Sequence, residues 1–296
     1  MISKTAMITI CGRPNVGKST LANALAGEKI AIVSNKPQTT RNRITAVCQR
    51  GETQFVFLDT PGFHKPRTRL GDYMVNVVRQ SVADVDAVVL VVEPVASIGP
   101  QERELIASIK AADCPAVLAI NKLDTVEPEK LLAVIALYSE AYAFNAIVPI
   151  SAKTGDGVEE LLKELDKFAV ESPALFPEGV TTDQPEKQVC AELIREKLLL
   201  NLEREVPHGT AVEITRFSER DDGIIDLEAT IYCEKASHKG IIIGKHGAML
   251  KKIGEDARKD IEEFMGTKVF LQTWVKVKEK WRDSNSLLRN FGYTDT

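Results

Sequence analysis

The stretch Gly12–Ser19 constrains the fold of this chain more than any other part of its sequence. It places four residues between two glycines and follows the second glycine directly with a lysine and a serine. An apolar run, Met7–Cys11, precedes this stretch, and a helical pattern, Ser19–Leu25, follows it. A glycine-rich loop between a strand and a helix turns several backbone N–H groups toward one point, where the helix dipole adds to their field. The pattern therefore predicts a phosphate-binding loop in an α/β domain.

Apolar, β-branched runs alternate with helical patterns along the first part of the chain. Strands are expected at Met7–Cys11, Ile44–Gln49, Gln54–Leu58, Ala87–Val92, Ala116–Ile120 and Ala146–Ile150. Helices are expected at Ser19–Leu25, Asp72–Ser81, Gln101–Lys110, Glu129–Tyr142 and Val158–Phe168. This alternation predicts a doubly wound, mostly parallel sheet over residues 1–170.

Prolines and a glycine then interrupt the pattern over residues 171–187, which we interpret as a linker. A different order of elements follows it. We expect a helix, two strands around a turn, a short helix, a helix, a strand and a last helical stretch, at Val189–Glu205, Thr210–Phe217, Ile224–Cys233, the residues before Gly244, Ala248–Phe264, Lys268–Val277 and Glu279–Arg289. Residues 188–296 are thus predicted to form a smaller α+β domain.

Composition narrows the functional classes. The formal net charge of −4 gives no general attraction to nucleic acid, so any such site must come from local clustering of charge. The longest clean apolar run, Ala87–Val92, is far shorter than the roughly 20 residues that span a bilayer. The N-terminus has no signal-peptide layout, and the 5 cysteines are widely spaced. These features favour a cytoplasmic protein without disulfides or a zinc site.

Two further motifs indicate which nucleotide the loop would bind. Asp59-Thr60-Pro61-Gly62 follows an apolar strand, where an aspartate can hold Mg²⁺ through water and a glycine N–H can sense a γ-phosphate. Asn121-Lys122-Leu123-Asp124 ends a later strand, and its aspartate can accept hydrogen bonds from N1–H and the 2-amino group of guanine. Ser151-Ala152-Lys153 follows the next strand and can offer the Ala152 N–H to guanine O6.

Together with Gln38-Thr39-Thr40-Arg41, these motifs resemble the translation-factor-related GTPases of the Ras-like fold. The resemblance implies hydrolysis of GTP to GDP with Mg²⁺, in which Lys18 reaches the β- and γ-phosphates. It implies a Mg²⁺-binding threonine in the switch loop; we favour Thr40, with Thr39 as the alternative. The residues expected to bind nucleotide are Gly12, Arg13, Pro14, Asn15, Val16, Gly17, Lys18, Ser19, Thr20, Asp59, Thr60, Pro61, Gly62, Asn121, Lys122, Asp124, Ser151, Ala152 and Lys153. Those expected at the metal are Ser19, Thr40 and Asp59, and those expected to act in catalysis are Lys18, Asn15, Thr40 and Gly62.

Phe63 stands where Ras-like signalling proteins carry the glutamine that orients the attacking water. A phenyl ring cannot hydrogen-bond to water, so slow intrinsic hydrolysis is expected. GTPases with such a substitution often use a loop asparagine to hold K⁺ near the phosphates, and Asn15 matches that position; the alternative is that Asn15 only shapes the loop. His64 as a replacement base is the weaker hypothesis, because a single switch-loop histidine is more often a surface residue.

The second half carries Gly244-Lys245-His246-Gly247 between a short apolar segment and an amphipathic helix. In this setting it resembles the loop of a type II KH domain, whose small residues let a nucleic-acid backbone approach closely. Residues 235–282 contain 12 Lys and Arg against 6 Asp and Glu. RNA contact is expected at Gly244, Lys245, His246, Gly247, Lys251, Lys276, Lys278 and Lys280. Trp274 and Trp281 either stack on bases or pack in the core, and we favour packing.

Taken as a whole, the chain resembles the bacterial Era GTPases, over nearly all of its residues. The resemblance implies a cytoplasmic, monomeric GTPase that binds the 3′ end of 16S ribosomal RNA through its KH domain and acts in assembly of the 30S subunit. Weak peripheral association with the inner membrane is also implied. Two alternatives remain open at this point: an RNA chaperone whose nucleotide pocket is structural, and a membrane-associated signalling GTPase.

Overall fold

The computed structural model describes residues 2–62, 68–81 and 85–293. Contacts between Cα atoms divide the chain into two compact units. We call these the first unit, comprising Met1–Ala31, Thr40–Pro66 and Gly71–Asp183, and the second unit, comprising Ile32–Thr39, Arg67–Leu70 and Gln184–Thr296. By these contacts, most of the expected linker, residues 171–183, groups with the first unit, and the short segment Ile32–Thr39 groups with the second.

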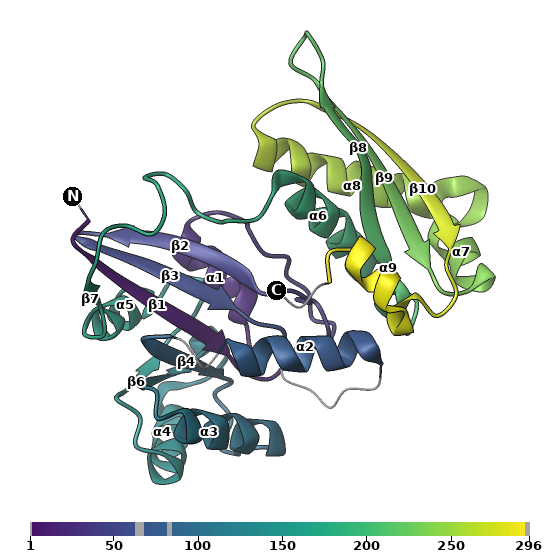
Figure 1. Cartoon of the computed structure of the whole chain (residues 1–296). Helices are drawn as coiled ribbons and strands as arrows, with labels where there is room; N and C mark the ends of the chain where they lie inside the picture. Colours follow the sequence, from purple (N-terminus) through teal and green to yellow (C-terminus); the bar gives the residue numbers. More distant parts are fainter. Residues whose placement is uncertain (1, 63–67, 82–84, 294–296) are drawn as a thin grey trace. The chain divides into compact units, whose positions relative to one another are not determined.

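A mostly parallel sheet forms the centre of the first unit (Figure 1). Its strands are β1 (Lys4–Cys11), β2 (Ile44–Arg50), β3 (Thr53–Asp59), β4 (Ala87–Val92), β5 (Ala116–Ile120), β6 (Ala146–Pro149) and β7 (Val170–Glu171). The order is β2-β3-β1-β4-β5-β6, with β7 beside β1. Among the described strands of this sheet, β2 and β7 run antiparallel to their neighbours, β3 and β1, and the other pairs are parallel. The six expected strands are therefore confirmed, with ends that differ by a few residues.

Helices cover both faces of this sheet. They are α1 (Lys18–Ala26), α2 (Arg69–Gln80), α3 (Pro100–Ala112), α4 (Pro128–Ala141) and α5 (Val158–Asp166), with a short 3-10 turn η1 (Leu123–Thr125). Side chains of β4 alternate between the two cores: Val89 and Val91 pack with α1 and α5, whereas Val88 and Leu90 pack with α2, α3 and α4. This alternation follows from the two-residue period of a strand and confirms a doubly wound α/β fold.

Part of the segment expected to be a linker makes hydrogen bonds to strands of the first sheet. Gln54 accepts hydrogen bonds at its side-chain oxygen from the amides of Leu175 and Phe176, at 2.8 and 2.9 Å. Farther along, the Val47 amide donates to the carbonyl of Thr181 at 2.7 Å. Proline and glycine stop helices and central strands, but they do not prevent a chain from following a sheet edge through such single bonds.

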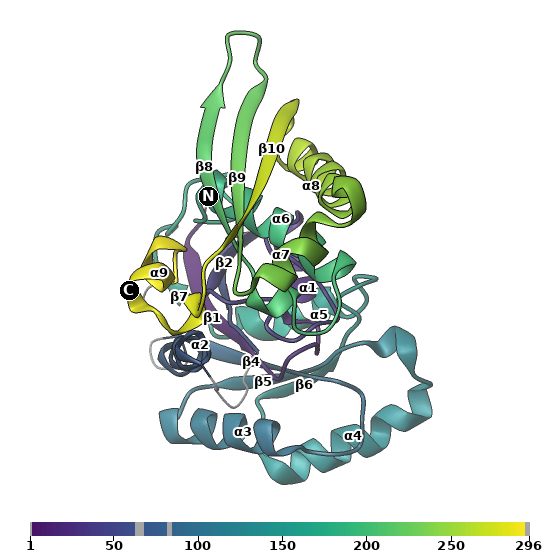
Figure 2. The same cartoon turned by 90° about the vertical axis from the view of Figure 1, so that its right-hand side faces the viewer.

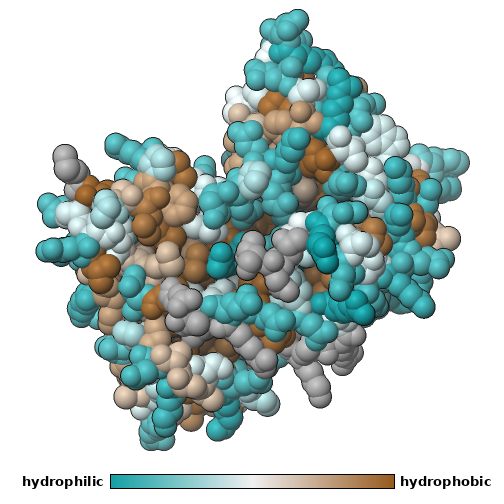
Figure 3. Space-filling view, in the orientation of Figure 1, coloured by the Kyte–Doolittle hydropathy of each residue, from teal (hydrophilic) through white to brown (hydrophobic). Residues whose placement is uncertain are grey.

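The second unit contains a three-stranded sheet, and the helices that precede its last strand share a core with one face of that sheet (Figure 2). Its elements are α6 (Glu186–Asn201), η2 (Pro207–Gly209), β8 (Ala211–Glu219), β9 (Ile225–Cys233), α7 (Ala236–Ile243), η3 (Lys245–Gly247), α8 (Ala248–Met265), β10 (Val269–Val277), η4 (Trp281–Asp283) and α9 (Asn285–Asn290). Strand β9 is central, antiparallel to β8 and parallel to β10. The expected α-β-β-α-α-β order is confirmed. The turn between β8 and β9 presents a hydrophilic surface (Figure 3).

The last expected helix, Glu279–Arg289, is wrong as a single element. Lys280 has a left-handed φ of 53°, and Ser284 is extended and caps α9 through its hydroxyl. Between them, Trp281 is fully buried, and its indole N–H donates to the carbonyl of Gly209 at 2.9 Å. The interpretation of Trp281 as a core residue is confirmed, and fixing its ring in the core breaks the helical path. Trp274 is 42% exposed on β10.

Candidate nucleotide site and nucleic-acid groove

The phosphate-binding loop connects the end of β1 at Cys11 to the start of α1 at Lys18. Gly17 has a φ of 98°, and a Cβ atom there would lie 2.2 Å from the side-chain nitrogen of Asn121. Only glycine fits this position, because other residues would meet both backbone strain and a steric clash. The loop therefore leads directly into the N-terminus of α1, the kind of helix end at which phosphate groups bind.

Lys18 and Asp59 form the charged centre of this site, and both side chains are buried. Burial lowers the pKa of Lys18, and the nearby Asp59 carboxylate opposes that shift. Burial raises the pKa of Asp59 to about 6, although Lys18 and a hydrogen bond from Ser19 act in the opposite direction. Burial disfavours the charged form of each group. A bound anion would stabilise the Lys18 cation, and a bound cation would stabilise the Asp59 carboxylate, so this centre is suited to charged ligands.

Three oxygen-bearing side chains meet at the N-terminus of α1. The Ser19 hydroxyl donates to Asp59 Oδ2 at 2.8 Å and lies 2.7 Å from the Thr40 hydroxyl. The other Asp59 oxygen, Oδ1, is buried and has no hydrogen-bond partner among the described residues. Hydroxyl and carboxylate oxygens are the donors that Mg²⁺ prefers, so this group fits that ion. Thr39 turns elsewhere, since its hydroxyl donates to the carbonyl of Lys36 at 2.6 Å.

Asn121 joins the phosphate-binding loop to the loop after β6. Its amide donates to the carbonyl of Val16 at 2.8 Å, and its side-chain oxygen accepts from the Ala152 amide at 2.9 Å. The Ser151 hydroxyl donates to Asp124 Oδ1 at 2.7 Å, which leaves the other carboxylate oxygen for a base. These bonds bring Asn121, Asp124, Ser151 and Ala152 together from two sequence motifs.

Glu93, which the sequence analysis missed, holds two predicted site residues in place. Its carboxylate pairs with the side chains of Arg13 and Lys122, while Arg13 also pairs with Glu102 at 2.9 Å. Glu93 follows β4 directly, at the same edge of the sheet as the loops after β1 and β5. That position in the sequence was the available signal, because carboxyl ends of parallel strands meet at one edge.

The remaining predicted residues differ in their surroundings. Thr60 is buried and donates from its hydroxyl to the carbonyl of Ile10 at 2.9 Å, so its side chain serves the fold. Gly62 lies against the phosphate-binding loop, because a Cβ atom there would come within 2.8 Å of Pro14. Asn15 is exposed with a left-handed φ of 67°. Thr20 and Lys153 lie in α1 and in the loop after β6, and Phe63 and His64 lie outside the described residues.

In the second unit, the Gly-x-x-Gly loop separates α7 from α8. Gly244 has a φ of 72°, and a Cβ atom there would lie 2.7 Å from that of Met249. His246 and Gly247 also have positive φ, and Lys245 and His246 are exposed. The loop therefore presents a basic and an imidazole side chain on a tight turn that glycine makes possible.

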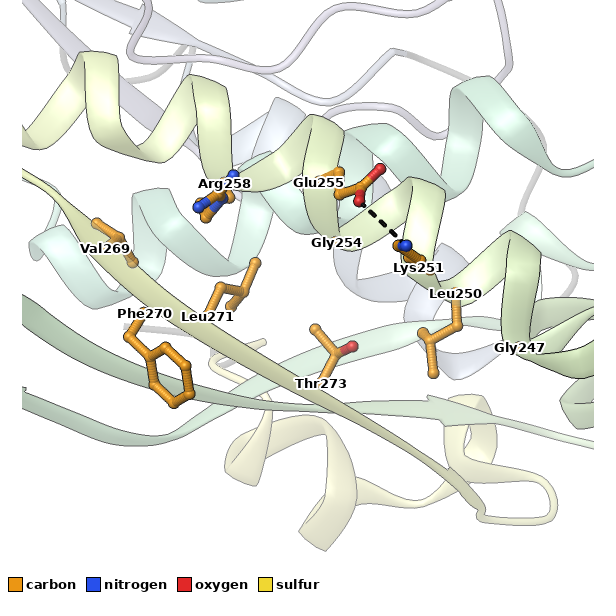
Figure 4. Close-up of a pocket in the computed structure, with 10 residues that line it drawn as sticks. All are labelled: Gly247, Leu250, Lys251, Gly254, Glu255, Arg258, Val269, Phe270, Leu271 and Thr273. Carbon is orange, nitrogen blue, oxygen red and sulfur yellow. Dashed lines mark ion pairs between the residues drawn. The ribbon is translucent and has the colours of Figure 1, made fainter.

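A groove of about 550 Å³ runs between α8 and β10, next to this loop (Figure 4). Leu250, Val269 and Leu271 supply apolar surface, and Lys251 and Arg258 supply positive charge. Lys251 lies 3.8 Å from Glu255, the ion pair drawn in Figure 4. The other residues that line it are Gly247, Gly254, Glu255, Phe270 and Thr273. An apolar floor with a cationic rim suits unstacked bases and their phosphates.

The predicted RNA contacts fall into two groups. Lys251 and Gly247 line the groove, and Gly244, Lys245 and His246 adjoin it. Lys276, Lys278 and Lys280 are exposed along the end of β10 and the chain after it. The sequence analysis did not assign Arg258 or Gly254 to the RNA site, although they continue along α8, at i+3 and i+4 spacing, the helix face that begins with Gly247 and Lys251.

The chain is similar to known proteins over nearly its whole length. The chain matches the family described as 50S ribosome-binding GTPase over residues 7–122 and the KH domain family over residues 205–282. It is 53% identical to the GTPase Era of Ruminiclostridium cellulolyticum, covering 99% of this chain and 98% of the relative. It is 50% identical to the GTPase Era of Alkaliphilus metalliredigens, covering 99% and 100%.

Two solved structures are similar over nearly the whole length. One is an Aquifex aeolicus Era variant bound to GDP·AlF4⁻, and the other is Era in complex with MgGDPNP and nucleotides 1506–1542 of 16S ribosomal RNA. Each has a TM-score of 0.95 and 36% sequence identity, and each covers 99% of this chain and 100% of that chain. Within the described part of the chain, no helix has the length and apolar character needed to cross a membrane.

Proposed function

Since the chain belongs to the Era family of GTPases, we propose that its described sites serve one cycle of GTP hydrolysis coupled to RNA binding. The chain is a GTPase with a C-terminal KH domain. The observation that carries the assignment is the meeting of Ser19, Thr40 and Asp59 at the start of α1. If these three side chains were apart, the phosphate-binding loop could still bind nucleotide, but it would lack oxygen donors for the divalent cation.

Each residue of the nucleotide site then has a distinct task. Lys18 neutralises charge on the β- and γ-phosphates, and backbone N–H groups of the loop bind the same oxygens. Ser19, Thr40 and Asp59 hold Mg²⁺, which neutralises charge that builds up on the phosphate oxygens during transfer to water. The Gly62 amide, held beside Pro14, contacts the γ-phosphate and so distinguishes GTP from GDP.

Guanine is selected by the loops that Asn121 joins. The carboxylate of Asp124 accepts from the N1–H and 2-amino groups, which adenine does not offer. The Ala152 amide hydrogen donates to Asn121 in this structure, so a hydrogen bond to guanine O6 requires that this hydrogen be shared with O6 or released from Asn121. Lys122, oriented by Glu93, covers the base with its aliphatic stem.

The groove between α8 and β10 binds single-stranded RNA. Its floor receives bases while the loop Gly244–Gly247 lets the backbone pass closely, with Lys245 and His246 beside the phosphates. The similar Era structure contains nucleotides 1506–1542 of 16S ribosomal RNA, which supports the 3′ region of that RNA as the ligand. We also propose that the protein acts in assembly of the 30S subunit and that it is a monomer. Weak association with the membrane stays a prediction.

Replacing Lys245 and His246 by Asp tests the RNA assignment. Two carboxylates would then repel the phosphates, while both glycines of the turn remain. About four phosphate contacts give a slope of log affinity against log salt near −3 for single-stranded RNA. We expect the variant to lose most affinity for a 16S 3′-end oligonucleotide and to flatten this slope, with GTP hydrolysis unchanged.

The matched control carries Lys130→Asp and Ala133→Asp, two exposed positions of α4 that change the charge equally. It should bind RNA like the unaltered chain. Retention of affinity and slope by the loop variant would exclude this groove as the RNA site.

Asn15 is proposed to hold K⁺ beside the phosphates. It is exposed on the phosphate-binding loop, where its carboxamide oxygen is a suitable ligand for a hard cation. Exchange of NaCl for KCl at equal ionic strength should raise kcat, and Asn15→Ala should abolish the increase. Equal rates in both salts would exclude this role.

A further inference from the structure

Strand β10 has two faces, and the groove uses one of them. Side chains of a strand alternate between its faces, so Leu271 and Thr273 face the groove (Figure 4) while Trp274 faces the other way. We call this second face of the three-stranded sheet its outer face, because Val269 and Val275 on the opposite face pack in the core with α6 and α8. Among the described strands, β10 pairs with β9 alone and forms an edge of the sheet. An RNA strand that leaves the groove therefore reaches the outer face by crossing this edge.

Trp274 stands on the outer face with 42% of its surface exposed. A tryptophan side chain is large and usually packs in the core, as Trp281 does. Among the described residues, no aromatic ring or cation lies on the ring of Trp274. Phe270, four residues earlier on the same face, differs, because Cζ of Arg220 lies 5.2 Å from its ring centre. Trp274 thus offers an aromatic surface that has no such partner.

The charges around Trp274 favour an anionic ligand. Towards the turn between β8 and β9, acidic and basic side chains of the outer face neutralise one another in ion pairs, Arg220 with Asp226 and Arg216 with Asp226 and Glu228. Glu213, across β9 from Trp274, accepts a hydrogen bond from Tyr232 at 2.8 Å. Lys276, two residues beyond Trp274 on the same face, is exposed and forms no ion pair with any described residue. A cation beside an exposed indole suits a stacked base and its phosphate.

The surroundings of Trp274 suit RNA better than a protein partner. Protein docking surfaces gather several large apolar side chains, whereas the neighbours of Trp274 along this face of β10 are Gln272 and Lys276. Aromatic rings on a sheet with cations beside them are a common way to hold single-stranded nucleic acid. The groove on the other face of the same strand supplies continuity.

We infer that Trp274 is a stacking platform for one base of a single-stranded RNA that leaves the groove and crosses the edge of β10, with Lys276 beside the adjoining phosphate. This role differs from the core packing that the sequence analysis favoured for Trp274. All the residues involved belong to the second unit. The inference rests on the proposed RNA groove, which it extends by one subsite.

Tryptophan fluorescence tests the contact directly. The chain contains 2 tryptophans, and Trp281 is fully buried, so Trp274 is the one that a base can reach. The 16S 3′-end oligonucleotide should quench the emission of the unaltered chain, because a stacked base quenches an indole. The quenching should be absent from Trp274→Leu. In a series of saturating oligonucleotides with one abasic nucleotide at each position in turn, it should disappear at a single position.

Affinity and its salt dependence separate stacking from charge. Trp274→Leu should weaken RNA binding about five- to hundredfold, as for loss of one stacked base, with an unchanged salt slope. Trp274→Phe keeps an aromatic ring and should restore most of the affinity. Lys276→Ala should instead flatten the slope by about 0.7. Leu200→Ala, which removes another exposed apolar side chain of the second unit, is the matched control and should bind RNA normally.

Undiminished RNA affinity of a folded Trp274→Leu chain would overturn the inference and leave the outer face for a partner other than RNA. An equal loss of affinity in Trp274→Phe would also overturn it, since a phenyl ring can still stack. If Trp274→Leu does not fold, the abasic series decides, and quenching that no abasic position removes would overturn the inference. A Lys245 and His246 variant with unchanged affinity and slope would overturn the proposed groove instead, while quenching would still report whether RNA lies on Trp274.

Discussion

The nucleotide site and the RNA groove are built in opposite ways. In the nucleotide site, the buried side chain of Asn121 already makes hydrogen bonds to backbone groups of two loops, the carbonyl of Val16 and the amide of Ala152. In the groove, charged side chains such as Lys251 stand at an exposed rim over apolar surface. The first arrangement holds each group in place through specific hydrogen bonds, and the second offers an open surface on which several weak contacts add up.

This difference predicts how strongly single substitutions should affect each site. A preorganised polar site depends on every member, because a buried group left without its partner is strongly unfavourable. An open groove loses affinity in increments, since each stacked base or phosphate contributes separately. Single substitutions should therefore be severe in the first unit and graded in the second.

Lys18→Ala should give the largest effect. Lys18 is buried at the centre of the site, whereas Arg13, the other cation of the phosphate-binding loop, is paired with Glu93 and Glu102. We expect GTP hydrolysis to fall about 10³-fold, near the upper range for loss of one preorganised charged donor. Phosphate release measures the rate, and circular dichroism should show an intact fold.

Lys110→Ala, an exposed change on α3, is the control and should hydrolyse GTP normally. A Lys18→Ala variant with near-normal turnover would mean that the nucleotide site tolerates loss of its central charge, and the comparison with the groove would no longer hold.

Asp124→Asn should give the next largest effect, and it changes specificity rather than rate. An amide can donate to the 2-oxo group of xanthine but cannot accept both guanine hydrogens. We expect GTP affinity to fall about 10²-fold and XTP affinity to rise, because the lost bonds leave polar groups unpaired. Competition binding with the two nucleotides measures both.

Asp156→Asn removes the same charge from the neighbouring loop and should leave base choice unchanged. Equal GTP affinity in the Asp124 variant would assign guanine recognition to other groups.

The two sites also differ in how well the sequence foretells them. The spacing of residues alone located Gly12–Ser19 and Asn121–Asp124, because a phosphate-binding loop and a guanine-binding loop each need particular residue types directly after particular strands. Spacing did not locate Glu93, whose role depends on two loops that are distant in the sequence. Nor did it show that Ile32–Thr39 packs on α6, because that contact joins segments more than 150 residues apart.

In the second unit, the sequence predicted the order of elements and the loop Gly244–Gly247, but not the groove floor. Leu271 looks like an ordinary strand residue until β10 is placed beside α8. The same limit applies to Lys280 and Ser284, where a left-handed residue and a cap split a helix that periodicity favoured. Local sequence patterns predict helices and strands. A surface formed between two such elements can be described only once their packing against each other is known.

The pH dependence of folding stability tests the burial of Asp59, and the expected effect is smaller than in the two variants above. Its pKa is raised in the folded chain to about 6 from 3.8, mainly by burial. The folded state therefore binds this proton more tightly than the unfolded state, so the contribution of Asp59 to stability grows as pH falls and is lost as pH rises through 6. Between pH 7 and pH 5 it should amount to about 1 kcal/mol, at 1.36 kcal/mol per pKa unit.

The measurement is urea unfolding of the nucleotide-free chain and of Asp59→Asn at both pH values. Other carboxylates titrate in both proteins, so the difference between the two isolates Asp59. The unaltered chain should gain stability relative to the variant at pH 5. A constant difference would show that Asp59 is solvated, and the nucleotide site would then be less enclosed than its geometry indicates.

Gly254→Ala should give the smallest effect, and it probes the open character of the groove. Gly254 lies within α8 and lines the groove, and a Cβ atom there would meet nothing within 4 Å. Alanine should therefore stabilise the helix by about 0.5–1 kcal/mol, since glycine is the poorer helix former. The added methyl group occupies space that a base would use, so RNA affinity should fall a few-fold. The salt slope should not change, because no phosphate contact is touched.

Gly266→Ala, at the left-handed C-cap of α8, is the matched control and should lose stability without affecting RNA binding directly. A more stable Gly254→Ala chain with undiminished RNA affinity would place the bases outside this groove, and a complete loss of binding would show that the groove is as exacting as the nucleotide site.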